Sequence, residues 1–400
     1  MKAPPRPNPL WSSPAFRRLW LARTASHVGD GIALVALVLL VQGSQGSGTA
    51  VGALLLASSL PRFLGPLTGI VADRVEQRTL MVACDLGNAA IFAVIVGLQP
   101  SFGLLLVLVG ASATLVTFFE PAGRSAIPSL VHVNDLLQAN AWMGTSLNLQ
   151  VALGTLLGGA LVATVGVRGA LAIDALSFVV SAALLIGLPP LRAQSNDAHG
   201  FLAFGKEGLR FVWRTRIVRT FVIVLFLGVA FAAADNIALV FLVRETLDGG
   251  PFAFGVVSAV FGVGMIAASV GLSIRRTSLA VTSLLLAAWL MSGIATIATG
   301  VAPAIAIAAL AQGVGGLGNG LQNVAADTLI QRAVPHDLLG RVFGVVSGAA
   351  FAGSTLAYAA GGVLLDVTSP RSVFLIAGSG ILAVTAVMWA VIRRETRSAP

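Results

Sequence analysis

The sequence predicts an all-α integral membrane protein, with twelve transmembrane helices in two pseudo-symmetric six-helix bundles. Three observations predict this class. Of the 400 residues, 56% are hydrophobic and only 10% are charged, whereas soluble domains carry about 25% charged residues. Apolar runs of roughly 20 residues recur along the whole chain, and each is long enough to cross ~30 Å of hydrocarbon. Finally, the basic residues gather in alternate loops between these runs.

Each apolar run is expected to be a helix, because a segment in lipid must satisfy its backbone hydrogen bonds internally. The alternating ten-residue pattern of a membrane β-barrel is absent from the sequence. Two groups of glycines are expected to let helices approach closely, namely Gly154, Gly158 and Gly159, and Gly313, Gly316 and Gly320. The expected spans cover about 18–42, 50–73, 79–98, 102–122, 136–164, 169–190, 217–243, 252–273, 278–300, 303–330, 338–365 and 372–392.

The distribution of positive charge predicts the orientation of these helices. Nearly all of the 25 Lys and Arg residues, Arg23 among them, fall on the side of the two termini. The exceptions are Arg168, Arg244 and Arg371 in the opposite loops and Arg62 within a helix. The positive-inside rule then places both termini in the cytoplasm. The net charge of +9 therefore indicates topology and contact with lipid headgroups, and no nucleic-acid partner is expected.

The chain is expected to divide into an N-terminal six-helix bundle over 1–190 and a C-terminal one over 217–400. Between them, 191–216 is polar and Arg-rich, which predicts a cytoplasmic linker with an amphipathic helix on the membrane surface. The halves also share short patterns at equivalent helix ends, which indicates a duplicated transporter fold. These patterns are Asp135-Leu136-Leu137 with Asp337-Leu338-Leu339, and Gly158-Gly159 before Arg168 with Gly361-Gly362 before Arg371.

The loop after the second expected helix carries the motif G-x-x-x-D-R-x-x-x-R, formed by Gly69, Asp73, Arg74 and Arg78. With the helix number and the central linker, this motif resembles the major facilitator superfamily. The resemblance implies a conformational latch, in which Asp73 accepts hydrogen bonds at the N-terminus of the eleventh helix and the arginines pair with acidic groups or headgroups. The alternative is a topology signal with an ordinary loop cap.

A finer resemblance points to the branch of macrolide-efflux and enterobactin-exporter proteins. It rests on the segment from Pro121 to Val131, on Asp174 to Phe178, on Gly29-Asp30 and on Val342 to Gly344; Gly123 departs from the branch pattern. The resemblance covers nearly the whole chain. It implies a proton-driven secondary exporter of amphipathic compounds, such as drug-like, siderophore or other secondary-metabolite molecules, and does not identify one substrate.

Charged residues at bilayer depth are costly and indicate function by default. Asp30 lies about 18 Å into the first helix, at 1.5 Å per residue, and Arg62 is about as deep in the second. We expect the two to pair, with Asp30 as a proton-coupling or substrate-contact carboxylate; a static structural pair is the alternative. Asp235 and Asn236 in the seventh helix are the next candidates for proton or substrate recognition.

Four further intramembrane charges are expected to be structural. Glu120 and Arg124 stand at i,i+4 spacing and should pair. Asp327 should pair with Arg332 or Arg341, and Asp174 is expected to bond near Arg168. Phe351 is one of several aromatic residues that could stack on a substrate, although each is first expected to face lipid or to pack inside the bundle.

Other functional classes find no support in the sequence. There is one cysteine, Cys84, and the four histidines lack metal-ligand spacing, so no metal site or cofactor is expected. No phosphate-binding loop or catalytic constellation is present, which argues against an ATP-driven pump or an enzyme. The expected protein is a monomeric exporter in a bacterial plasma membrane, with protons, lipid and a small amphipathic substrate as partners. A uniporter or importer on the same fold, or a non-transporting sensor or scaffold, is the alternative.

Overall fold

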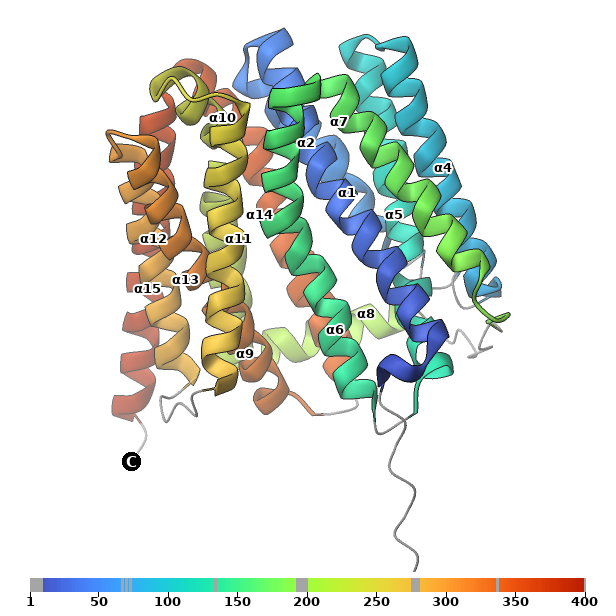
Figure 1. The fold of residues 1–400 in the computed structure, drawn as a ribbon. Helices are drawn as coiled ribbons and strands as arrows, with labels where there is room; N and C mark the ends of the chain where they lie inside the picture. The colour runs from blue at the N-terminus through green and yellow to red at the C-terminus, as the bar shows by residue number, and fades with distance from the viewer. Residues whose placement is uncertain are drawn as a thin grey trace, which may run out of the picture.

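The computed structural model describes residues 10–65, 68, 71, 74–132, 135–191, 201–274, 281–335 and 338–398. Every regular element within these ranges is helical (Figure 1). In chain order the elements are η1 (Leu10–Ser12), α1 (Pro14–Gln45), α2 (Gly48–Ser59), η2 (Leu60–Leu64), α4 (Gln77–Leu98), α5 (Phe102–Leu130), α6 (Leu136–Leu149), η4 (Gln150–Gly154), α7 (Thr155–Ile186), α8 (Phe201–Arg214), α9 (Arg216–Ala232), α10 (Asp235–Phe241), η5 (Leu242–Thr246), α11 (Pro251–Ile274), α12 (Val281–Val301), α13 (Ile305–Ala333), α14 (Leu339–Val367) and α15 (Pro370–Ser398).

Nine helices in the described ranges are long and apolar enough to cross a membrane. One of them, Gln138–Ile186, is 49 residues long and bends at Gly166, where φ is 75° and ψ is 174°. Only glycine adopts this conformation at low cost. The shorter Gly48–Leu64 is also apolar, whereas α13 is not among the nine. The structure is therefore an all-helical membrane bundle.

The two ends of α1 illustrate how the local sequence determines where a helix begins and ends. The Ser13 side chain accepts a hydrogen bond from the Phe16 amide, and Pro14 occupies the first turn, where its missing N–H costs nothing. At the other end Gly46 adopts φ 60° and closes the helix with its amide on the Gln42 carbonyl. The turn that follows is short, so α2 runs back beside α1.

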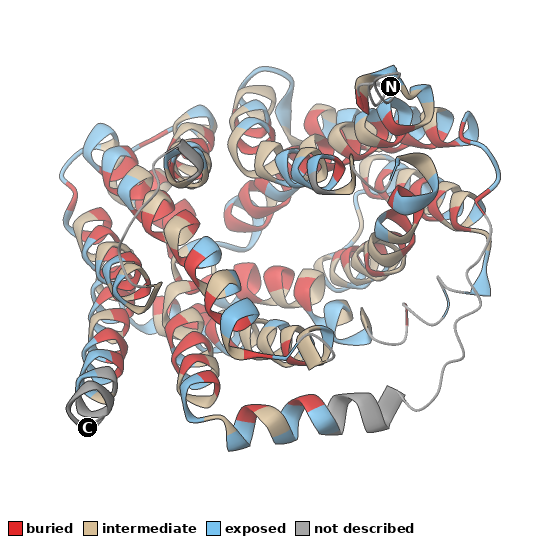
Figure 2. Ribbon diagram, turned by 90° about the horizontal axis from the view of Figure 1, so that it is seen from below, coloured by how far each residue is buried: buried red, intermediate tan, exposed pale blue. Residues whose placement is uncertain are grey.

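The helices pack as a first group, α1–α7, and a second group, α9–α15, which Figure 2 shows side by side. We call the end of the bundle at Pro14 and Ser398 the terminal face, and the other end the opposite face. Near the opposite face one apolar core contains residues of both groups, such as Leu54 and Phe241. Toward the terminal face the core divides in two, one around Phe119 and one around Trp289. The groups are thus joined at the opposite face.

Polar contacts reinforce this junction. Gln42 of α1 donates to Glu245 of η5 at 2.9 Å. The carboxylate of Asp366, at the end of α14, accepts from the backbone amides of Gly48 and Thr49 at the start of α2, at 2.5 and 3.0 Å. Asp366 therefore caps the N-terminus of a helix in the other group, where the helix dipole favours negative charge.

Both predicted sets of glycines lie at close helix contacts, which confirms that expectation. A Cβ on Gly154 would lie 2.9 Å from the Gly31 Cα of α1, and one on Gly159 would lie 2.7 Å from the Gly255 Cα of α11. The second set packs on α11, where a Cβ on Gly320 would lie 2.6 Å from the Met265 carbonyl oxygen. Gly159 and Gly255 belong to different groups, so this contact is part of the junction.

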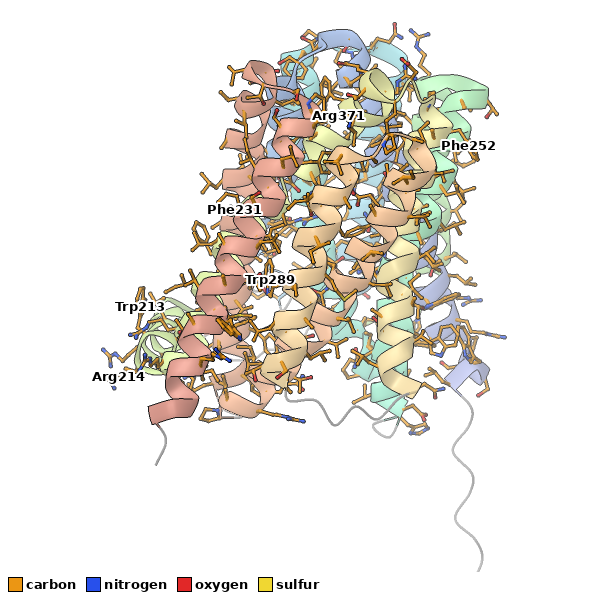
Figure 3. The ribbon with its side chains drawn as sticks, turned by 90° about the vertical axis from the view of Figure 1, so that its left-hand side faces the viewer. Trp213, Arg214, Phe231, Phe252, Trp289 and Arg371 are labelled. Carbon is orange, nitrogen blue, oxygen red and sulfur yellow. The ribbon has the colours of Figure 1, made fainter. Side chains whose placement is uncertain are left out.

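Helix α8 lies where the sequence predicts an amphipathic linker helix and runs across the direction of the bundle (Figure 1). Gly208 packs against the backbone of Arg341, and the Arg341 guanidinium donates to Glu207. Trp213 and Arg214 point away from the bundle (Figure 3), and 56% of Trp213 is exposed. The rest of the predicted linker, 192–200, lies outside the described residues.

Candidate functional site

Six ionisable side chains from four helices meet inside the first group. We call them the acidic cluster: Arg23, His27 and Asp30 of α1, Asp85 of α4, Glu120 of α5 and Asp174 of α7. All except Asp174 line an internal cavity of about 10 Å³, which has room for roughly one water molecule. Asp174 is not among the lining residues, but it lies close enough to Asp30 to interact with it electrostatically.

The ion pair of Arg23 and Glu120 anchors the cluster. A guanidinium nitrogen of Arg23 lies 2.8 Å from Glu120 Oε1, and its Cζ lies 4.9 Å from the centroid of the Phe119 ring. The predicted Glu120–Arg124 pair is confirmed at 3.8 Å, but the Arg124 side chain is 81% exposed. Because solvent screens an exposed charge, the buried Arg23 is the main partner of Glu120.

His27 connects this ion pair to α6. The Ser146 hydroxyl donates to the Met143 carbonyl at 2.7 Å, so its oxygen is left to accept from Nδ1 of His27 at 3.1 Å. The other ring nitrogen, Nε2, faces Glu120 Oε1 at 3.7 Å. Ser146 lies one turn before η4, a π-helical segment that packs against Gly262 of the second group. The imidazole therefore links the carboxylate to the junction between the groups.

Three carboxyl groups of the cluster have no cation at ion-pair distance among the residues that the structure describes: Asp30, Asp85 and Asp174. Asp85 and Asp174 are 1% and 0% exposed. Gly29 makes room for Asp174, since a Cβ there would lie 2.5 Å from Asp174 Oδ1. Four carboxyls thus share one guanidinium and one imidazole, and like charges that interact inside a membrane disfavour ionisation of all four together.

Removal of the guanidinium should destabilise the fold. We expect Arg23→Gln to cost about 1–3 kcal/mol, because it leaves the partly buried Glu120 carboxylate without its closest partner. Thermal unfolding of the purified protein measures this loss. Glu120→Gln in the same chain should recover much of it, since the double variant buries no unpaired charge; equal loss in the single and double variants would contradict the assignment.

A second constellation spans the two groups, and we call it the cross-group cluster. Arg62 of η2 lies with its Cζ 5.6 Å from the centroid of the Phe351 ring of α14. About two turns further along α14, the Tyr358 hydroxyl accepts from the Asn236 amide at 3.4 Å. Arg62 and Asp235 both act electrostatically on this phenol, and Gln312 of α13 is the hydrogen-bonding partner of Asp235.

The structure separates two residues that the sequence was expected to pair. The predicted Asp30–Arg62 ion pair is wrong: Asp30 faces α4, α5 and α7 inside the first group, whereas Arg62 faces α14. Asp235 and Asn236 do lie together with Arg62. Arg23, which the charge pattern counts with the basic residues on the side of the termini, is 8% exposed and lies well inside α1.

The remaining predicted partners differ as well. Asp174 contacts Ser177 at 3.4 Å and neighbours Asp30 instead of Arg168. Asp327 is exposed on α13, and Arg341 pairs with Glu207. Sequence reasoning missed Arg23 and His27 as site residues, although their spacing with Asp30, at i,i+4,i+7, is the signal of one helix face.

Half of the predicted latch motif, Gly69 and Asp73, lies outside the described residues. Arg74 is exposed. Arg78 donates to the Leu188 carbonyl at 2.9 Å and lies 3.7 Å from Glu76. Partial burial disfavours ionisation of Glu76, but hydrogen bonds from Thr79 and the Leu191 amide, with the Arg78 charge, lower its pKa. This carboxylate therefore stabilises the loop above its unfolded pKa, and the stabilisation is lost as the pH falls.

Comparison with known proteins gives a consistent result. The family model described as "Transmembrane secretion effector" matches residues 8–399. The chain is 28% identical over 375 residues to the MFS-type transporter YfiS of Bacillus subtilis, covering 90% of this chain and 89% of the relative. It is 26% identical over 379 residues to the multidrug efflux pump Tap of Mycolicibacterium fortuitum, covering 90% and 91%. The enterobactin exporter EntS of Citrobacter koseri is 28% identical over 187 residues, covering 46% and 45%.

Solved structures share the fold. The nucleoside transporter NupG superposes with a TM-score of 0.78 at 13% identity, covering 94% of this chain and 99% of that chain. The POT family transporter PepTSo gives a TM-score of 0.77 at 10% identity, covering 96% of this chain and 99% of that chain. At these identities the likeness establishes the fold and nothing about the substrate.

Proposed function

Since this chain belongs to the transmembrane secretion effector family of the major facilitator superfamily, we propose that it is a proton-coupled exporter of small amphipathic compounds. It is a transporter and not an enzyme, as its family and relatives are. Among the relatives, one is named a multidrug efflux pump and one an enterobactin exporter, which favours drug-like or siderophore-like cargo.

Twelve crossings fit the helices. The nine apolar helices include one of 49 residues, which bends at Gly166 and is long enough for two crossings. The nine helices therefore supply ten crossings, and Gly48–Leu64 and the 29-residue α13 supply the remaining two. Two six-helix units, 1–190 and 217–400, then move against each other about the linker 191–216.

The acidic cluster is the observation that carries proton coupling. One guanidinium and one imidazole serve four carboxyls inside the membrane, so at least one carboxyl is a natural site for an exchangeable proton. Asp30 is the proposed coupling residue, because it lines the internal cavity and neighbours a second carboxyl, Asp174, that no described cation pairs with. His27 and Ser146 join the cluster to the junction of the two groups, so proton binding has a route to the relative placement of the groups.

The packing of the cores supports alternating access. The first and second groups share one core at the opposite face and have separate cores at the terminal face. The shared core holds the two groups together at the opposite face, whereas separate cores allow the groups to move apart at the terminal face. In the proposed cycle the protein alternates between this state and one joined at the terminal face, with Asp73, Arg74 and Arg78 as the latch.

Transport by inside-out membrane vesicles tests the proposal. Respiration acidifies the vesicle lumen, and a panel of dyes, macrolides and siderophore-like compounds is then added to vesicles with and without the protein. Export moves compound into the lumen and protons out, so a pH-sensitive dye reports proton release. Accumulation that dissipation of the proton gradient leaves unchanged would contradict proton coupling. Accumulation in the reverse direction would favour an importer.

Orientation has its own test. We propose a monomer in a bacterial plasma membrane with both termini cytoplasmic, because the terminal face carries most of the basic residues. On a Cys84→Ser background, an impermeant maleimide added to intact cells should label Gly250→Cys at the opposite face and leave Ser398→Cys unlabelled. The reverse pattern would invert the topology.

A further inference from the structure

Arg62 is a cation at the boundary of the two groups, and the described part of the chain offers it no anionic partner. It is exposed, and no carboxylate lies at ion-pair distance from it among the residues that the structure describes. Its neighbour across the boundary is the apolar face of Phe351. A guanidinium within a membrane protein is costly and is retained where it meets an anion, a cavity or a substrate.

The neighbours of Arg62 add further hydrogen-bond donors. The Tyr358 oxygen accepts from Asn236, so its own O–H remains to donate. The second N–H of the exposed Asn236 amide is likewise available. Asp235 is the nearby acid, and it is partnered by Gln312 of its own group and makes no ion pair with Arg62. The accessible side of the cluster is therefore rich in donors and carries positive charge.

We propose that the cross-group cluster is a subsite for the anionic end of an aromatic amphipath, such as a carboxylate, sulfonate or phenolate on a ring system. Arg62 binds the anion through its planar fork of N–H groups. Tyr358 and Asn236 donate to it from the second group, and Phe351 packs on the ring. This inference rests on the proposed function and names the substrate class of the same transporter.

The position of the subsite gives binding a mechanical effect. Arg62 comes from the first group, whereas Phe351, Tyr358 and Asn236 come from the second. A ligand held by both sets of donors binds only when the groups stand at the right separation. By linkage, such a ligand shifts the protein toward that arrangement.

Direct binding to the full protein in lipid nanodiscs tests the subsite without any gradient. The probes are 2-naphthoate, 2-naphthalenemethanol and 2-naphthylmethylamine, which share one ring system and differ in charge. Isothermal titration should give 2-naphthoate the tightest binding. Arg62→Gln should weaken it by at least about tenfold, as expected for the loss of one charge-assisted contact, with Arg62→Lys in between. Tyr358→Phe should weaken 2-naphthoate binding less than Arg62→Gln does. Because this change removes only a hydroxyl group, it tests the subsite even if Arg62→Gln fails to fold.

Arg168→Gln is the matched control, since Arg168 is also exposed but lines a separate cavity of about 580 Å³ at the opposite face of the first group. Unchanged 2-naphthoate binding in this variant supports the assignment. The proposal is overturned if wild type, Arg62→Gln and Tyr358→Phe bind 2-naphthoate equally. It is also overturned if 2-naphthylmethylamine binds more tightly than 2-naphthoate, or if only Arg168→Gln loses 2-naphthoate binding. If Arg62→Gln transports compounds as wild type does, the exporter function is retained and this subsite is rejected. Arg62-dependent binding with no transport would leave the subsite and remove the exporter.

Discussion

Replacement of Asp30 by Asn is expected to abolish compound-triggered proton release from inside-out vesicles while leaving the folded protein in the membrane. Asparagine has the shape of aspartate but cannot take up or release a proton. The Arg23–Glu120 ion pair, which anchors the acidic cluster, does not involve Asp30, so the fold should survive. The measurement is dye-reported proton release, together with accumulation of the same compound.

A matched control separates coupling from general damage. Asp248 is exposed in the loop after η5 and has φ 52°, a conformation that asparagine also tolerates. Asp248→Asn should therefore behave as wild type. Proton release that persists in Asp30→Asn would remove Asp30 from the coupling path. Compound-triggered proton release would then be measured in Asp85→Asn and Asp174→Asn, which change the two fully buried carboxyls of the cluster.

The second large effect is expected from Gly159→Leu. A Cβ at Gly159 would lie 2.7 Å from both the Gly255 Cα and the Pro251 carbonyl oxygen of the other group. These atoms belong to backbone and cannot turn aside, so the two groups must separate at the opposite face. Transport should fall to background, because the protein can no longer close that end. Leucine is a better helix former than glycine, so the helix itself should not suffer.

Spin labels measure this separation directly. On a Cys84→Ser background, labels at Gln45→Cys and Asp248→Cys report on the first and second groups at the opposite face. The distance between them should lengthen in Gly159→Leu. Gly103→Leu is the control, because a Cβ at Gly103 meets nothing within 4 Å. An unchanged distance with normal transport would show that the junction tolerates the added bulk.

The sequence predicted the membrane class well, because hydropathy and loop charge depend on the lipid and not on the contacts between helices. It also selected Asp30, Arg62, Asp235 and Asn236 as charged or polar residues at depth. It failed on the pairing of Asp30 with Arg62. Depth along a helix follows from residue number, but the direction in which a side chain faces depends on packing, which a hydropathy pattern does not contain.

A helix boundary explains why Arg23 was counted with the inner basic residues although it lies within the first expected span. The first span was expected from residue 18, whereas α1 begins at Pro14 and is capped by Ser13. Four residues correspond to about 6 Å along a helix, enough to move Arg23 from the interface into the bundle. The polar side chains of α13, among them the buried Gln312 and Gln322, lower its apolarity, but the sequence still indicated a span over 303–330 there.

Three apolar cores, one shared and two separate, have a consequence for the energetics of the proposed cycle. Passing to a state joined at the terminal face would dissolve the shared core at one end and merge two cores at the other. The apolar area exposed at one end and the area buried at the other are of the same kind. The free energies of the two states therefore differ only by a small remainder of large opposing contributions. In such a near-degenerate pair, a tenfold difference in ligand affinity between the states, about 1.4 kcal/mol, is enough to reverse which state predominates.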